Sequence, residues 1–187
     1  MNTQILDPEM QRRVQAELRP GEFLKWSAQP DPKRYAKSSM MIWIFFIPWT
    51  AFALFWMAAA SGFQMPSFDH GWSFFPLFGL PFVLIGIGGL SSPLWKRNEA
   101  KFMVYAITDQ RAFIIQGKKT IKVLTYSPSD INAIERSERK DGSGDLFFHS
   151  RMRRDSDGDM QTDRHGFIAV SNVRHVHGLI EELAANA

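Results

Sequence analysis

The stretch YAITDQRAFII, residues 105–115, has the pattern of two short β-strands joined at a polar turn. Apolar and β-branched residues fill both halves, and Asp109-Gln110 separates them. Further strand patterns follow it, and the most apolar part of the chain precedes it. The stretch therefore predicts the first β-hairpin of a domain that comes directly after a strongly apolar region.

Short strand patterns separated by turns continue from this hairpin toward the C-terminus. The predicted strands cover residues 102–108, 111–116, 120–126, 130–136, 145–150 and 165–170, and a polar loop is predicted at 151–163. One helical stripe follows Asn172, a favourable N-cap residue, and consists of Val173, Val176, Ile180 and Leu183. The pattern predicts a small barrel or sandwich closed by one helix.

The apolar region before the hairpin has no charged residue between Lys37 and Asp69, and none between Asp69 and Lys96. An α-helix over residues 40–60 would be about 30 Å long, which matches the hydrocarbon core of a bilayer. Residues 72–95 are also uncharged, and the segment between the two runs has the composition of a turn. We therefore expect a hairpin of two transmembrane helices.

Basic residues flank the two predicted spans, whereas the loop that connects them carries no Lys or Arg. By the positive-inside tendency, both termini and the strand-rich domain are expected on the cytoplasmic side. Two core helices of a water-soluble protein are the alternative, which we disfavour because helices apolar on every face need a larger protein around them. The flanking residues are Lys33, Arg34 and Lys37 before the spans and Lys96, Arg97 and Lys101 after them.

The N-terminal part has a short amphipathic helix pattern that ends at Pro20-Gly21, followed by strand-like alternation over residues 22–28. This strand is a candidate for completing the domain that lies beyond the spans. The predicted divisions are an N-terminal helix and strand at 1–38, a first transmembrane helix at 39–61, an outer loop at 62–71, a second transmembrane helix at 72–95 and a cytoplasmic domain at 99–187.

The residues from Tyr105 to Arg111 resemble the Tyr-x-hydrophobic-Thr-(Asp/Asn)-x-Arg motif of bacterial pleckstrin-homology-like domains. The resemblance covers roughly residues 100–187, and LRPGEFLKWSAQP at 18–30 is similar to the lead-in of membrane-anchored members. It implies an α+β protein of the bacterial cytoplasmic membrane, with a two-helix transmembrane hairpin and a β-barrel of about seven strands capped by a C-terminal α-helix. It also implies a structural role in the hairpin for Tyr105, Thr108, Asp109 and Arg111.

The net charge of +3 raises the possibility of nucleic-acid binding, but its distribution argues against it. The excess of basic residues lies beside the apolar runs, and the domain that follows is balanced, whereas a duplex-binding domain carries its own basic face. Two basic clusters remain, and we expect them to meet anionic lipid headgroups, a partner, or only solvent along charged strand edges. They are Arg151, Arg153 and Arg154, and Lys118, Lys119 and Lys122.

No catalytic motif of recognisable spacing occurs, and the absence of cysteine excludes thiol chemistry and disulfides. His149 and His165 can meet across strands, but no third ligand is evident for a metal. We therefore expect no catalytic residue, no metal, no cofactor and no enzymatic activity.

The expected function is a membrane-anchored interaction or scaffold module that docks a protein partner or self-associates. A sensor of anionic lipid headgroups and an accessory subunit of a membrane enzyme or transporter are the alternatives.

Overall fold

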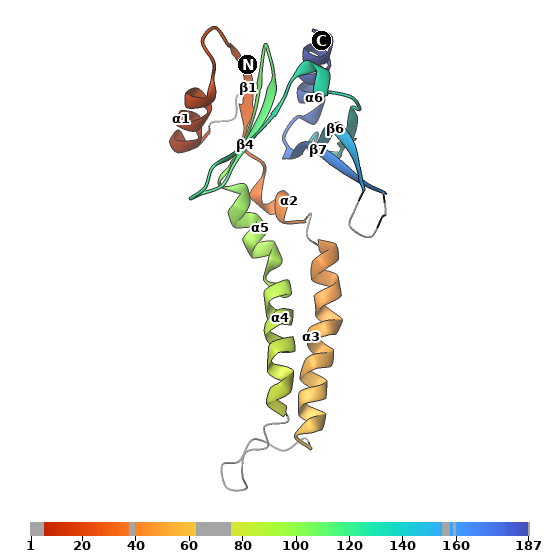
Figure 1. Ribbon diagram of the computed structural model, residues 1–187. Coiled ribbons are helices and arrows are strands. Elements are labelled where there is room, and N and C mark those ends of the chain that lie inside the picture. Colours follow the sequence, from red (N-terminus) through yellow and green to blue (C-terminus); the bar gives the residue numbers. More distant parts are fainter. Residues whose placement is uncertain (1–5, 38–39, 63–75, 155–157, 159, 187) are drawn as a thin grey trace. The chain divides into compact units, whose positions relative to one another are not determined.

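The computed structural model describes residues 6–37, 40–62, 76–154, 158 and 160–186 (Figure 1). The chain forms two compact units: unit 1 comprises Met1–Tyr35 and Asn98–Ala187, and unit 2 comprises Ala36–Arg97. Unit 2 is therefore an insertion in the sequence of unit 1. The chain leaves unit 1 after its first strand and returns before its second.

Unit 1 contains two antiparallel β-sheets. Sheet A has the order β1-β2-β3-β4, and sheet B has the order β5-β6-β7. In sheet A, the strand that precedes unit 2 pairs with the strand that follows it, with Trp26 opposite Ile107. The strands are β1 (Leu24–Ala28), β2 (Met103–Thr108), β3 (Ala112–Gln116), β4 (Lys122–Tyr126), β5 (Glu135–Glu138), β6 (Gly144–Arg154) and β7 (Met160–Val170).

The predicted closed β-barrel is wrong, because no strand ladder joins sheet A to sheet B among the described residues. The predicted strand at 130–136 also begins later, at Glu135. A 3₁₀ turn, η3 (Pro128–Asp130), explains both differences. Pro128 has no N–H to donate to a strand ladder, and the Asp130 carboxylate accepts hydrogen bonds from the Ser127 backbone N–H (2.8 Å) and from the Ser127 hydroxyl (2.6 Å). The chain is turned out of sheet A before β5 starts a new sheet.

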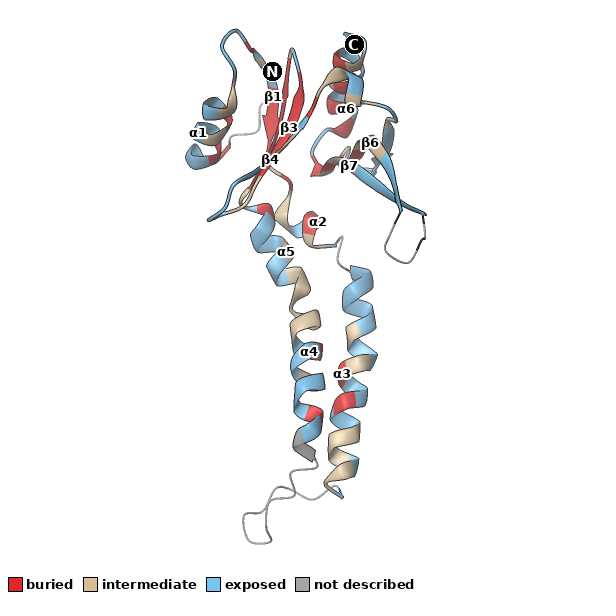
Figure 2. Cartoon of the chain, viewed as in Figure 1, coloured by how far each residue is buried: buried red, intermediate tan, exposed pale blue. Residues whose placement is uncertain are grey.

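The core of unit 1 lies between sheet A on one side and sheet B with α6 (Val173–Ala184) on the other (Figure 2). Tyr105 stacks on Phe167, with ring centroids 4.7 Å apart, and Phe148 meets Phe167 edge-on at 4.9 Å. The opposite face of sheet A is covered by α1 (Pro8–Glu17), which buries Met10 and Val14. The central strands β2 and β3 are therefore buried on both faces, whereas β4 is partly exposed.

Unit 2 contains one helix, α3 (Met40–Ala60), that is long and apolar enough by length and composition to cross a membrane. Its apolar side chains are largely exposed, including Met41 at 85% and Phe52 at 68%, so α3 does not resemble a core helix of a water-soluble protein. A bilayer is the solvent in which such a surface is stable.

The predicted two-helix transmembrane hairpin is wrong, because the second predicted helix at 72–95 is not continuous in the described residues. It is divided into η2 (Pro76–Gly79), α4 (Leu80–Leu90) and α5 (Ser92–Ala100). Pro81 and Pro93 stand in the first turns of α4 and α5, where a missing N–H is tolerated, and each therefore marks a new helix start. At 1.5 Å per residue, α4 alone is only about 16 Å long.

Helix α4 packs antiparallel to α3 through its glycines. A side chain at Gly86 would meet Thr50, and one at Gly89 would meet the ring of Phe46. The Trp49 indole N–H also donates to the carbonyl of Phe82 at 3.2 Å. The short helix α2 (Pro32–Lys37) precedes α3, and most of the predicted outer loop at 62–71 lies outside the described residues.

Candidate anion-binding pocket

Strands β6 and β7 have eleven residues each, and they extend beyond the core of unit 1. Their inner face begins with apolar pairs such as Leu146 opposite Phe167. An irregularity in the register between Phe147 and His149 then places polar residues on the continuation of this face. There His149 lies opposite His165, and Arg151 lies opposite Asp163.

A pocket of about 590 Å³ lies between this extended part of sheet B and the edge strand β4 of sheet A. Its volume falls in the range of ordinary small-molecule sites. The pocket exists because the two sheets do not close into a barrel on this side. It is lined by Leu124, Thr125 and Tyr126 from β4, by His149 and Arg151 to Arg154 from β6, and by Asp163 and His165 from β7.

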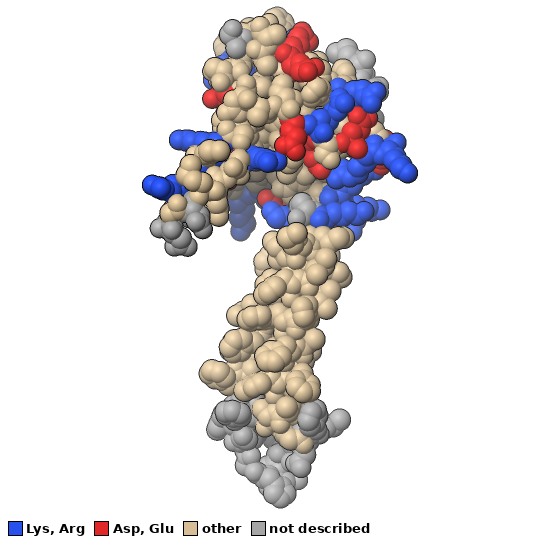
Figure 3. All heavy atoms as spheres, turned by 90° about the vertical axis from the view of Figure 1, so that its right-hand side faces the viewer, with Lys and Arg blue, Asp and Glu red and all other residues tan. Residues whose placement is uncertain are grey.

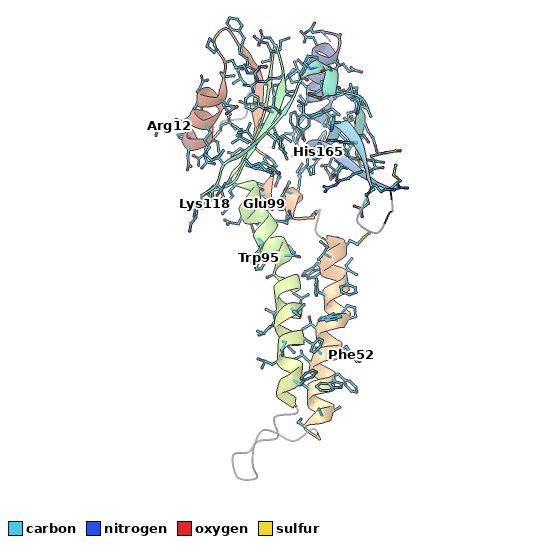
Figure 4. All side chains as sticks on the ribbon, in the orientation of Figure 1. Arg12, Phe52, Trp95, Glu99, Lys118 and His165 are labelled. Carbon is cyan, nitrogen blue, oxygen red and sulfur yellow. The ribbon has the colours of Figure 1, made fainter. Side chains whose placement is uncertain are left out.

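Three aromatic rings form one wall of the pocket. Tyr126 lies 5.5 Å from the ring of His149 and 5.9 Å from that of His165, and the two imidazoles are 5.8 Å apart. The His149 Nδ1 lies 2.7 Å from the carbonyl oxygen of Asp130, which can only accept a hydrogen, so Nδ1 carries it and Nε2 is left for another partner. Burial, with the nearby Asp130 carboxylate, raises the pKa of Tyr126 to about 12, which keeps its hydroxyl protonated at neutral pH. Figure 4 labels His165 in this region.

Among the described residues that line the pocket, three are arginines and one is an aspartate, so their net charge is positive. Among the described residues, no ion pair is formed by Arg151, Arg153 or Arg154, although the Arg154 Nε donates to the carbonyl of Gly158 at 3.3 Å. The neighbouring Arg164 differs, because its guanidinium is paired with Glu135 at 2.9 Å. Figure 3 shows Lys and Arg side chains on the face that carries β6 and β7, with Asp and Glu side chains among them.

The two basic clusters predicted from the sequence occupy different places in unit 1. Arg151, Arg153 and Arg154 meet in the pocket. Lys118 and Lys119 belong to the β3–β4 turn and Lys122 begins β4, and none of the three lines the pocket. The turn is tied instead to the start of β2, because the backbone N–H of Gly117 donates to the carbonyl of Phe102 at 3.0 Å.

Thr108 and Arg111 bind the β2–β3 turn to the N-terminal part of unit 1. The Arg111 guanidinium donates to both oxygens of Glu22, at 2.8 Å and 3.1 Å, and to the carbonyl of Glu17 at 2.8 Å. The Thr108 hydroxyl donates to Glu22 at 2.8 Å and accepts from the backbone N–H groups of Gln110 and Arg111. All three side chains are buried, so this cluster is structural and offers no site to a ligand.

Tyr105 and Asp109 also make contacts within the fold. The Tyr105 hydroxyl lies 3.3 Å from both the N–H and the carbonyl oxygen of Ile168. The Asp109 carboxylate accepts from the backbone N–H of Phe23 at 2.9 Å, and its own N–H donates to the carbonyl of Phe23 at 3.1 Å. These bonds join the start of β1 and the end of β7 to the β2–β3 hairpin.

No group of three or more potential metal ligands occurs in the part of the chain that the structure describes. Comparison with protein-family models, with curated proteins and with solved structures finds no match.

The expectation that His149 and His165 meet across strands is confirmed, but sequence reasoning missed the pocket that they share with Tyr126 and Asp163. The signal was the alternation His149-x-Arg151-x-Arg153, which places three polar side chains on one face of a strand. The segment 151–163 was predicted as a loop because it lacks apolar residues at alternate positions.

Proposed function

We propose that this protein is a membrane-anchored module that binds a phosphate-bearing anion in the pocket between β4 and β6–β7. The observation that carries the proposal is the set of three arginines that line one pocket without an ion-pair partner among the described residues. Guanidinium groups match the geometry of phosphate oxygens, and the tyrosine hydroxyl is a further donor.

The membrane anchor in this proposal is unit 2. Support comes from α3, whose length and apolar, exposed surface fit a bilayer. Because β1 and β2 pair with each other across the insertion, both ends of unit 2 leave from one folded sheet. The basic residues on either side of unit 2 favour the cytoplasmic side of a bacterial membrane for unit 1 in this proposal.

The headgroup of an anionic lipid is the source of the phosphate that best suits an anchored module, because the bilayer supplies it at high local concentration. A soluble phosphate monoester has the same chemistry. The two sources are separable by experiment, since only the lipid is part of the bilayer that holds the protein.

The test is a titration of the full chain with glycerol 1-phosphate in nanodiscs of neutral lipid. Arg151→Gln and Arg153→Gln should each weaken binding about 10-fold, because each removes a charge-assisted hydrogen bond in a partly exposed site. Arg164→Gln is the matched control, since it removes the same charge from the same hairpin outside the pocket. Equal affinity in all four proteins, or no binding at all, would contradict the proposal.

A second arm repeats the titration in nanodiscs that contain anionic lipid. If a lipid headgroup is the ligand, it occupies the pocket and the apparent affinity for glycerol 1-phosphate falls. If the physiological ligand is soluble, adding anionic lipid changes the affinity for glycerol 1-phosphate only through general repulsion of the anion by the charged surface, and added salt removes that change.

A protein partner is the second candidate function, and β4 favours it. This strand is an edge of sheet A, and its residues Leu124 to Tyr126 line the pocket, so an extended segment of a partner has both backbone groups and a cleft available. Crosslinking from a photoreactive residue at Thr125 in native membranes would detect such a partner.

A further inference from the structure

The β3–β4 turn together with the first residue of β4, residues 117–122, combines a cationic surface with one exposed apolar side chain. Its sequence, GKKTIK, has three lysines and no acidic residue. Residues 118–122 are all exposed, and Ile121 is 53% exposed. A single exposed isoleucine is unremarkable alone, but one placed between lysines is typical of segments that rest on an anionic bilayer.

The turn is fixed at its base. Gly117, with φ of +111°, donates its N–H to the Phe102 carbonyl at 3.0 Å, and its own carbonyl accepts from Arg13 at 2.6 Å. The ammonium group of Lys118 lies 5.2 Å from the centre of the Phe102 ring. The turn is thus held against residue 102 and cannot move away independently.

Residue 102 lies close in the chain to the point where unit 1 resumes. It is four residues beyond Asn98, and four residues span at most about 14 Å even when fully extended. The apolar run of the sequence ends at Trp95, and Lys96, Arg97 and Lys101 follow it. Within unit 1, the cationic turn is therefore held close to the residues at which the chain re-enters this unit.

We infer that residues 118–122 contact the surface of an anionic bilayer, with Ile121 in the interface and Lys119 and Lys122 toward the lipid phosphates. The inference rests on the proposed insertion of α3 in a membrane, and it is independent of the pocket and its ligand. It assigns unit 1 a second, peripheral attachment that fixes which side of the unit faces the lipid.

The absence of cysteine makes single-site labelling of the full chain straightforward. An environment-sensitive fluorophore is attached at Ile121→Cys in nanodiscs of neutral lipid with or without anionic lipid, and quenching by brominated acyl chains is measured. Phe23→Cys is the matched control, because Phe23 is 71% exposed and lies at Asp109, the opposite end of β3 from Gly117. Phe52→Cys on α3 reports insertion of the anchor.

In anionic nanodiscs, the label at 121 should shift to the blue and be quenched, the label at 23 should stay aqueous, and the label at 52 should be quenched in every lipid. Lys119→Gln and Lys122→Gln should each lower, about fivefold, the ratio of molecules whose turn is bound to the bilayer to molecules whose turn is free. If the label at 121 is not quenched while the label at 52 is quenched, this inference is overturned and the proposed anchor is not. An unquenched label at 52 would overturn both it and the proposed anchor.

Discussion

At the scale of single residues, Arg111 and Glu22 form the most buried ion pair among the described residues, with side chains 5% and 0% exposed. Burial opposes ionisation of Glu22, but hydrogen bonds from Arg111, from the Arg19 backbone and from Thr108 outweigh it and lower its pKa to about 2. The pair joins residues 17–22 to the β2–β3 turn across the insertion of unit 2.

Glu22→Gln leaves the Arg111 guanidinium buried without its carboxylate, and we expect it to lower the free energy of unfolding by about 3–5 kcal/mol. Urea denaturation followed by near-ultraviolet circular dichroism measures this. Glu135→Gln is the control, since Glu135 and Arg164 are both more than half exposed and such a pair contributes about 0–1 kcal/mol. Equal effects of the two substitutions would contradict the structural role of Glu22.

The same pair predicts a pH dependence. The ordinary pKa of Glu22 is 4.5 and its pKa in the fold is about 2, so its stabilising contribution is complete above pH 4.5 and is lost as the pH falls toward 2. Other carboxylates contribute in that range as well, and the comparison of wild type with Glu22→Gln isolates this one. The difference in unfolding free energy between them should shrink between pH 4.5 and pH 2, and a constant difference would contradict the assignment.

The residues of the β2–β3 hairpin could be predicted from the sequence because their pattern is local. Continuous apolar runs define the strands on both sides of Asp109, and Thr108 has a short side chain that bonds turn amides. The partner of Arg111 could not be predicted in this way. Glu22 is 89 residues away along the chain and is brought there only by the pairing of β1 with β2.

At the scale of elements, the adjacent residues Gly88 and Gly89 of α4 allow two substitutions to be compared directly. A methyl group at Gly89 would overlap the Phe46 ring, whereas nothing lies near a methyl group at Gly88. Both Gly→Ala changes favour the helix by about 0.5–1 kcal/mol, so the difference between them reports packing of α4 on α3. Thermal unfolding in detergent should show Gly88→Ala at or above wild type and Gly89→Ala below it; the reverse order would contradict the described packing.

The boundaries of the strands show why the pocket was beyond sequence reasoning. Residues 151–154 and 160–163 lack the apolar alternation of a half-buried strand, yet they are strand because they continue the ladder begun by Leu146 and Phe167. Conversely, residues 131–134 have apolar residues at strand-like spacing and are not strand, because η3 turns the chain just before them. In both cases, hydrogen bonds to another part of the chain, and not the local apolar pattern, determine whether the residues are strand.

At the scale of the whole molecule, the insertion of unit 2 between β1 and β2 was open to prediction, and its internal structure was not. The apolar run and the strand at 22–28 were both visible in the sequence. Composition alone made residues 72–95 look like a spanning helix, but new helices begin at the prolines at 81 and 93. Among the helices of the described residues, only α3 has the necessary length. Hydropathy measures the preference of a segment for lipid and does not register where its helix stops.

The central claim is that the pocket arginines hold an anionic headgroup at the membrane. Native mass spectrometry of the full chain, released from nanodiscs with equal amounts of neutral and anionic lipid, tests it most directly. Wild type and Arg164→Gln should retain one anionic lipid in preference to neutral lipid, and the double substitution Arg151→Gln, Arg153→Gln should lose that preference. Equal retention by all three proteins, or no preference in wild type, would contradict the account.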